Sequence, residues 1–296
     1  MRSGHPPDMA AERPPAPPEA ARIAEDVERA LAEDLGPGDA TAELLPPEVR
    51  AEAELWLREP AVLCGIPWFE ACFRVLDPAV RFEWHHHEGE RLDAETLIGV
   101  ITGNARALVS AERSALNFLQ TLSGTATTVD AWMRALAGSG VELLDTRKTL
   151  PGLRHAQKYA VRIGGASNHR MGLYDAMLIK ENHIAAAGSV SAAVRRAREA
   201  HPELPLQVEV ESLDQLEEAL AAGVESILLD DFDEEAIREA VERTRGRAKL
   251  EVSGGITLDR VRRLAELGVD RVSAGALTKH LRAVDFSLRF RTNRPT

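Results

Sequence analysis

Cysteine is nearly absent from this chain, which limits the chemistry that thiols could carry. Only Cys64 and Cys72 occur in 296 residues, and they follow no metal-binding spacing. We expect both thiols to be reduced and buried. No apolar run is long enough to span a bilayer, and the proline-rich start lacks the apolar stretch of an export signal. We therefore expect a cytoplasmic protein without a membrane partner.

Positive charge is also in short supply. The formal net charge is −11, which disfavours nucleic acid as a partner because duplex binding needs a basic surface. Lysine is especially rare beside arginine, with the positions Lys148, Lys158, Lys180, Lys249 and Lys279. Because arginine replaces lysine at most positions, the few remaining lysines are expected where a compact ammonium group is needed.

The scarce cations gather in the stretch from Val141 to His183. Two apolar runs, 141–144 and 176–179, are typical of buried parallel strands. Charged residues follow each run, and a third polar cluster lies between them: Asp145, Arg147, Lys148, Gly164–Arg170, Lys180, Glu181, Asn182 and His183. Cations at strand ends favour an anionic ligand, since these ends open onto loops. The alternative is that they are solvated strand ends, which fits three clusters less well.

The N-terminal part predicts an α+β unit behind a tail. Residues 1–20 contain six prolines and are predicted to be disordered. Hydrophobic spacing predicts helices at 21–35, 67–76, 111–122 and 125–137, and strands at 49–57, 61–65, 82–86 and 96–104. Arg113 would then lie near a helix start, where the helix dipole does not favour a cation. We therefore expect Arg113 to pair with a specific group, such as Glu112, a ligand or a neighbouring chain. We place this domain at 21–122, completed by 281–296.

The run His85-His86-His87 raises the question of a metal site. Neighbouring residues in a strand face opposite sides, so at most His85 and His87 could converge. No carboxylate or cysteine stands at ligand spacing, and solvated strand residues are the favoured interpretation.

Strands and helices alternate regularly after His183. Helices are predicted at 190–200, 213–222, 234–244 and 258–267, and strands at 206–210, 226–229, 249–252 and 271–273. With the two central strands, this spacing indicates six βα units and a parallel sheet in a domain at 123–280. No GxGxxG follows the first strand, so a dinucleotide-binding fold has no support. A closed barrel is favoured over an open doubly wound sheet, because every strand has polar residues or glycines at its C-terminal end.

The ends of the later strands carry acids and glycines. Glu209 and Glu211 share one face of their strand, and Asp230-Asp231 ends the next. The last two strands end in Ser253-Gly254-Gly255 and Ser273-Ala274-Gly275, with Lys279 nearby, which is typical of a barrel phosphate site. Acidic residues beside a phosphate site favour a phosphorylated sugar bound with Mg²⁺ as the ligand. The alternative is that Glu209 or Asp230 is an ordinary solvated acid at a strand end.

Several of these motifs resemble quinolinate phosphoribosyltransferases. They are DTRKTLPGLR (145–154), GGASNHRMGL (164–173), LIKENHI (178–184), VEVES (208–212) and SGGI (253–256). The resemblance runs from about residue 33 to residue 290, in the same order and with similar spacing. It implies an N-terminal α/β sandwich, an incomplete α/β barrel, and a homodimer with a shared active site.

The resemblance also implies a reaction and roles for individual residues. Quinolinate and phosphoribosyl pyrophosphate (PRPP) would give nicotinate mononucleotide, pyrophosphate and CO₂, with Mg²⁺. The quinolinate carboxylates would bind Arg147, His169, Arg170, Lys180 and, from the partner subunit, Arg113. PRPP would bind Lys148, Glu209, Asp230, Ser253, Gly254, Gly255, Gly275 and Lys279, with Glu209 and Asp230 also serving Mg²⁺. Lys148, Lys180, Glu209 and Asp230 would be the catalytic residues.

Two other functions remain open. A related phosphoribosyltransferase acting on another aromatic acid or base would need the same PRPP site. A phosphosugar-binding regulator without turnover fits less well, because a binder need not keep acids beside a phosphate.

Overall fold

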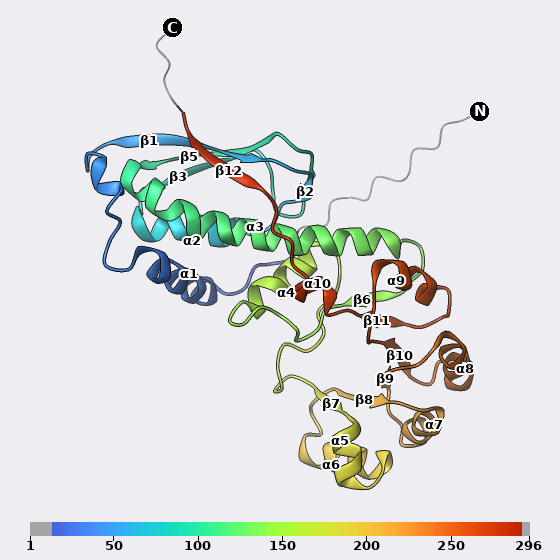
Figure 1. The fold of residues 1–296 in the computed structure, drawn as a ribbon. Coiled ribbons are helices and arrows are strands. Elements are labelled where there is room, and N and C mark those ends of the chain that lie inside the picture. Colours follow the sequence, from blue (N-terminus) through green and yellow to red (C-terminus); the bar gives the residue numbers. More distant parts are fainter. Residues whose placement is uncertain (1–13, 292–296) are drawn as a thin grey trace, which may run out of the picture.

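The computed structural model describes residues 14–291, which form an N-terminal layered part and a C-terminal barrel joined by one long helix (Figure 1). The predicted tail falls mostly outside the described residues. Of that tail, residues 14–19 have no regular structure, and the first helix, α1 (Ala20–Leu35), begins one residue before the predicted start.

An antiparallel sheet forms the outer layer of the N-terminal part. Its strand order is β12-β1-β5-β3, with β1 (Arg50–Leu57), β3 (Arg81–Trp84), β5 (Thr96–Asn104) and β12 (Phe286–Phe290). The helices α1, α2 (Ile66–Leu76) and α3 (Ala105–Ala135) lie on one side of this sheet (Figure 1). The core between sheet and helices is rich in large side chains such as Trp68, Phe69 and Phe73, all fully buried. The short elements are η1 (Ala42–Leu44), β2 (Ala61–Val62) and β4 (Arg91–Leu92).

Helix α3 corrects the prediction of two helices separated at Ser123-Gly124. The helix is continuous from Ala105 to Ala135, and Ser123 and Gly124 allow other segments to pack closely against it instead of forming a turn. The Ser123 hydroxyl accepts a hydrogen bond from the Cys64 N–H and donates one to the Cys64 carbonyl, each at 3.0 Å. A Cβ on Gly124 would lie 2.2 Å from the Arg282 carbonyl oxygen, so only glycine lets the returning chain pass. Arg113 consequently lies in the third turn of a helix, and its predicted place at a helix start is wrong.

The C-terminal part is a six-stranded parallel sheet in the order β6-β11-β10-β9-β8-β7. The strands are β6 (Glu142–Leu144), β7 (Met177–Ile179), β8 (Leu206–Val210), β9 (Ser226–Leu229), β10 (Lys249–Val252) and β11 (Arg271–Ser273). The strand and helix alternation confirms the six βα units. Their helices are α4 (Arg154–Ile163), α5 (Glu181–Ala187), α6 (Val190–Ala200), α7 (Leu213–Ala221), α8 (Glu234–Thr244), α9 (Leu258–Ala265) and α10 (Ala276–Lys279).

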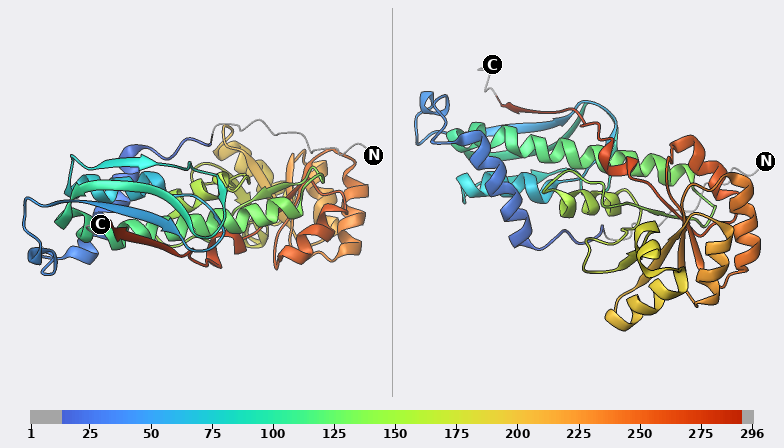
Figure 2. Two further views of the ribbon diagram at one scale, coloured as in Figure 1. Left: turned by 90° about the horizontal axis from the view of Figure 1, so that it is seen from above. Right: turned by 60° about the horizontal axis from the view of Figure 1, so that its bottom comes forward.

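The barrel does not close. Helices α6 to α9 ring the outside of the sheet (Figure 2), but β6 and β7 are its two edge strands and do not pair with each other. The closed barrel favoured by the strand-end pattern is therefore wrong, and the incomplete barrel is correct. Along the chain, β6 and β7 are separated by the loop 145–153, by α4 and by the loop 164–176. The first loop carries Arg147 and Lys148 of the predicted site, and the second carries His169 and Arg170.

Three smaller predictions also have outcomes. Cys64 and Cys72 are free and buried, as expected. His85–His87 follow the end of β3, so they are not strand residues, and His86 Nδ1 lies 2.8 Å from Glu90 Oε2. The described residues contain no helix that is long and apolar enough to cross a membrane.

Candidate active site

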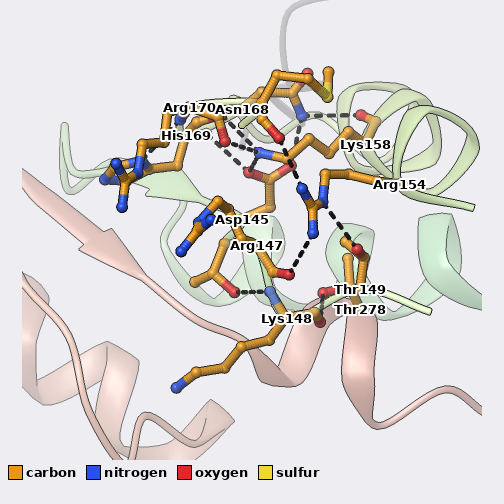
Figure 3. Close-up of polar contacts among 12 residues, drawn as sticks. Asp145, Arg147, Lys148, Thr149, Arg154, Lys158, Asn168, His169, Arg170 and Thr278 are labelled. Atoms are coloured by element: carbon orange, nitrogen blue, oxygen red, sulfur yellow. Dashed lines mark hydrogen bonds and ion pairs between the residues drawn. The ribbon is translucent and has the colours of Figure 1, made fainter. Parts of the chain in front are cut away.

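A fully buried ion pair lies beneath the predicted site. Lys158 Nζ, from helix α4, is 2.6 Å from Asp145 Oδ1, at the end of β6, and neither side chain is exposed. The same ammonium donates to the carbonyls of His169 and Arg170 at 2.6 and 3.0 Å (Figure 3). Asp145 in turn accepts from the His169 N–H and from Asn168 Nδ2. The pair thereby fixes the backbone of the loop that follows α4.

Burial and hydrogen bonding act in opposite directions on this pair. Burial raises the pKa of Asp145 and lowers the pKa of Lys158, because each charge has lost its water. Their mutual attraction and hydrogen bonds oppose both shifts. All three ammonium protons have acceptors, and both carboxylate oxygens have donors, as a buried charged pair requires. Lys158 was noted in the sequence only for its rarity, and no role was predicted for it.

Arg154 is a second organising residue that the sequence did not assign. Its guanidinium donates to Thr149 Oγ1, to the Arg147 carbonyl and to the Met171 carbonyl, at 3.2 to 3.3 Å (Figure 3). The loop after β6 is thus tied to the loop before β7. Because Arg154 lies inside a motif with several cations, its position alone did not distinguish a ligand-binding arginine from a structural one.

Three of the predicted quinolinate-binding cations line one cavity. Arg147, Arg170 and Lys180 border a cavity of about 520 Å³ beside β7, α5 and α6. Arg147 lies on the loop that follows β6, Arg170 on the loop that precedes β7, and Lys180 directly after β7. In Figure 3 the free ends of Arg147, Lys148 and Arg170 extend away from the buried ion pair, toward the same side of the view. Positive charge therefore converges on a space large enough for a small aromatic acid.

Charge in this cavity is only partly balanced. Burial lowers the pKa of Arg170, and the neighbouring positive charge of Arg147 lowers it further. Lys180 Nζ lies 2.5 Å from Glu209 Oε2, and the Glu209 side chain is almost fully buried. Arg147 makes no salt bridge among residues 14–291. A ligand with two carboxylates would supply the missing negative charge.

The predicted phosphate end lies at the neighbouring strand ends. Gly254 and Gly255 have φ of +85° and +56°, a backbone conformation that glycine adopts without strain. A Cβ on Gly275 would lie 2.8 Å from Lys148 Cδ, so this glycine lets the lysine cross it closely. Arg260 donates to the Gly254 carbonyl at 3.0 Å and was not predicted. Lys279 is exposed at the end of α10, and Ser253 Oγ donates to the Ser273 carbonyl at 3.4 Å.

Two predicted quinolinate ligands lie apart from this cavity. Arg113 is exposed on α3 and does not line it. His169 turns into the barrel, where with Arg170 it borders a second cavity of about 240 Å³. Its Nε2 lies 3.0 Å from Gln207 Oε1.

The acidic side chains suit a metal that arrives with its ligand. No cluster of three or more His, Cys, Asp or Glu that could hold a metal occurs within the described part of the chain. Asp230 Oδ1 would lie 3.3 Å from a Cβ on Gly254, so this carboxylate borders the glycine loop. Mg²⁺ is commonly bound by one or two carboxylates together with substrate phosphates, and Glu209 and Asp230 fit that donor set.

Comparison with known families decides the relationship of this chain. Residues 39–123 match the family model for the quinolinate phosphoribosyl transferase N-terminal domain, and residues 125–289 match the model for the C-terminal domain. The chain belongs to the quinolinate phosphoribosyltransferase family. The family and the fold class predicted from the motifs are thereby confirmed.

Individual members of this family are similar over nearly their whole length. The chain is 43% identical to the nicotinate-nucleotide pyrophosphorylase [carboxylating] of Mycobacterium leprae, over 88% of this chain and 95% of that one. It is 40% identical to a probable enzyme of the same name from Bacillus subtilis, over 86% and 89%. The solved nicotinate-nucleotide pyrophosphorylase of Francisella tularensis has a TM-score of 0.89 and 41% identity, over 92% and 97%.

Proposed function

We propose that the protein transfers the phosphoribosyl group of PRPP to quinolinate and releases CO₂, giving nicotinate mononucleotide and pyrophosphate. The observation that carries this proposal is the convergence of Arg147, Arg170 and Lys180 on one cavity. Membership of the family, whose relatives carry the name nicotinate-nucleotide pyrophosphorylase [carboxylating], supports the same reaction.

The cations account for recognition of the acid. Quinolinate has two adjacent carboxylates, and the planar guanidinium group of arginine can bind a carboxylate through two parallel hydrogen bonds. Arg147 and Arg170 would hold these carboxylates, with Lys180 as a compact third charge. The Lys180–Glu209 contact links this end of the site to the acids that would serve the ribose.

The acids account for the transfer step. As the bond from the ribose C1 to pyrophosphate breaks, positive charge develops on that carbon, and the carboxylates of Glu209 and Asp230 would stabilise it. The pyridine nitrogen then forms the new bond, so no protein nucleophile is required. The resulting cationic ring accepts the electron pair left by departing CO₂, and a proton replaces the lost carboxylate. The protein contributes position and electrostatics.

The proposal also includes Mg²⁺, bound together with PRPP, and a second subunit that contributes to the active site. Bound with PRPP, Mg²⁺ would neutralise charge on the leaving pyrophosphate beside Glu209 and Asp230. Lys148, Lys279, Ser253 and the glycines Gly254, Gly255 and Gly275 would hold the phosphate end. The exposed Arg113 does not reach the cavity of its own chain, which fits a homodimer in which it enters the partner's site. A cytoplasmic location and the absence of nucleic-acid partners stay predictions from the sequence.

A coupled assay tests the proposed function. Quinolinate, PRPP and Mg²⁺ should give nicotinate mononucleotide and pyrophosphate in equal amounts, and chelation with EDTA should abolish turnover. Pyrophosphate release with another aromatic acid, and none with quinolinate, would instead favour a related phosphoribosyltransferase. Binding of PRPP with no product from any acid would favour a regulator.

A further inference from the structure

The imidazole ring of His169 has both nitrogens occupied by the protein itself. The backbone N–H of Arg170 donates to Nδ1 at 2.8 Å, and Nε2 lies 3.0 Å from Gln207 Oε1. The side chain is 17% exposed, so little of the ring faces solvent. A ring in this position has no free N–H to offer to a carboxylate.

The backbone amide determines the rest of the hydrogen-bond pattern. An N–H can only donate, so Nδ1 must be the acceptor and the proton must lie on Nε2. Nε2–H then donates to Gln207 Oε1, which leaves the Gln207 amide nitrogen to donate at 2.8 Å to Glu251 Oε2. One chain of hydrogen bonds therefore runs from the loop at the cavity, through β8, to β10.

Glu251 is an unexpected residue at the end of this chain. Its side chain is 1% exposed, and its second oxygen, Oε1, has no hydrogen-bond partner within residues 14–291. Burying a carboxylate oxygen without a partner is unfavourable, so an apolar residue would be the simpler choice for the barrel interior. Gln207 and Glu251 border the same cavity as His169 and Arg170, so the buried carboxylate lies next to residues of the candidate site.

We infer that Gln207 and Glu251 are positioning residues, which hold His169 as the Nε2–H tautomer and thereby fix Arg170 for quinolinate. The inference rests on the proposed function for its substrate. His169 is anchored by its ring at Gln207 and by its backbone at Asp145 and Lys158, so Arg170, the next residue, is the part left to reach the ligand. Arg170 itself is tied by Nη1 to the Ala176 carbonyl at 3.2 Å. His169 is accordingly a positioning residue and not a direct ligand.

Nitrogen NMR of the histidine rings tests the tautomer without any catalytic readout. Of the nine histidines, His169 is assigned by comparison with His169→Gln. We expect a protonated Nε2 and an unprotonated Nδ1 in the free protein, and the same pattern after quinolinate is added. A proton on Nδ1, or a ring nitrogen that changes its protonation with quinolinate, would overturn the inference. The free-protein result stands even if quinolinate proves not to be the substrate.

Steady-state kinetics test the positioning role. Gln207→Leu breaks both hydrogen bonds, and we expect the KM for quinolinate to rise about tenfold to a hundredfold, with the KM for PRPP within about twofold. Gln215→Leu is the matched control, because the Gln215 side chain accepts from the Glu211 N–H and lines neither of the two cavities. An unchanged KM for quinolinate, or an equal rise for both substrates, would contradict the proposal.

Glu251 provides a conservative variant that keeps the fold. Glu251→Gln retains an oxygen to accept from Gln207, so we expect the KM for quinolinate to stay within about threefold of the parent. Glu251→Leu removes the acceptor and should behave like Gln207→Leu. If Glu251→Gln is as impaired as Glu251→Leu, the hydrogen-bond chain is not what positions His169.

Discussion

The buried scaffold and the cavity above it use the same residue types in opposite ways. In the scaffold, Lys158 and Asp145 are fully buried, and every charged atom has a partner. In the cavity, Arg147 is exposed and makes no salt bridge in the described part of the chain. The pKa of Arg170 is lowered by burial and, in addition, by the positive charge of Arg147. The comparison shows that the complete set of partners marks a structural charge, whereas an incomplete set marks one that is free for a ligand.

Breaking the scaffold should produce the largest effect. Lys158→Met leaves Asp145 buried without its counter-charge, and we expect a loss of about 3–5 kcal/mol in the free energy of unfolding. Denaturant unfolding followed by circular dichroism measures this. Lys249→Met is the control, since Lys249 pairs with Asp270 at the surface and should cost less than about 1 kcal/mol. A similar loss for both lysines would show that burial does not separate the two kinds of charge.

Removing a cavity cation should affect activity and leave the fold intact. For Arg147→Ala or Lys180→Ala we expect kcat/KM for quinolinate to fall by about a hundredfold or more, because a carboxylate would lose its charged partner. The thermal unfolding midpoint of Arg147→Ala should match that of Arg134→Ala, a surface control on α3. Near-normal turnover of either cavity variant would remove that residue from the quinolinate site.

A glycine variant sharpens the comparison at the phosphate end. Gly254→Ala forces a side chain into φ +85° and toward Asp230, so we expect the KM for PRPP to rise about tenfold, with the KM for quinolinate little changed. Gly246→Ala has a similar φ of +74° and open space around it, which controls for backbone strain alone. Equal effects in the two variants would argue against a phosphate role for Gly254.

The smallest effect concerns Glu88, a buried carboxylate that follows β3 and has no predicted part in catalysis. It accepts from the N–H groups of Gly65 and Ile66 and from the Tyr159 hydroxyl, and burial raises its pKa above the ordinary 4.5. A raised pKa favours the folded state below the unfolded pKa, and this contribution is lost as pH rises through the folded pKa.

Glu88→Gln removes that loss, because an amide does not ionise. We expect its melting temperature, relative to the parent, to become more positive by a few degrees between about pH 4 and about pH 7. Differential scanning calorimetry across this range measures the change. A constant difference at all pH values would show that ionisation of Glu88 does not affect stability.

Regular elements of the fold were predictable because hydrophobic periodicity and turn residues act locally. The alternation of strands and helices from Leu206 to Ser273 was found almost to the residue. The helix break expected at Ser123-Gly124 was wrong because the role of this glycine is not local. Gly124 makes room for the backbone of Arg282, a distant segment that no local sequence pattern reveals. Closure of the barrel likewise depends on whether β6 and β7 meet, which the spacing of strands does not determine.

The residues of the candidate site were predictable from the sequence, but which of them face the cavity and which are buried supports was not. The polar clusters at and between the two central strands indicated Arg147, Arg170 and Lys180, which do line one cavity. Lys158, Arg154 and Glu251 were missed as functional because sequence spacing does not show which charge is buried and which is exposed. His169 illustrates the same limit, since its role depends on which way the ring turns.

The most direct test measures CO₂ release from quinolinate labelled in the carboxylate next to the ring nitrogen. We expect one labelled CO₂ and one pyrophosphate for each nicotinate mononucleotide, only when PRPP is present, and loss of all three products together in Arg147→Ala. Pyrophosphate formation without labelled CO₂, or equal turnover in the parent and Arg147→Ala, would contradict the proposed function.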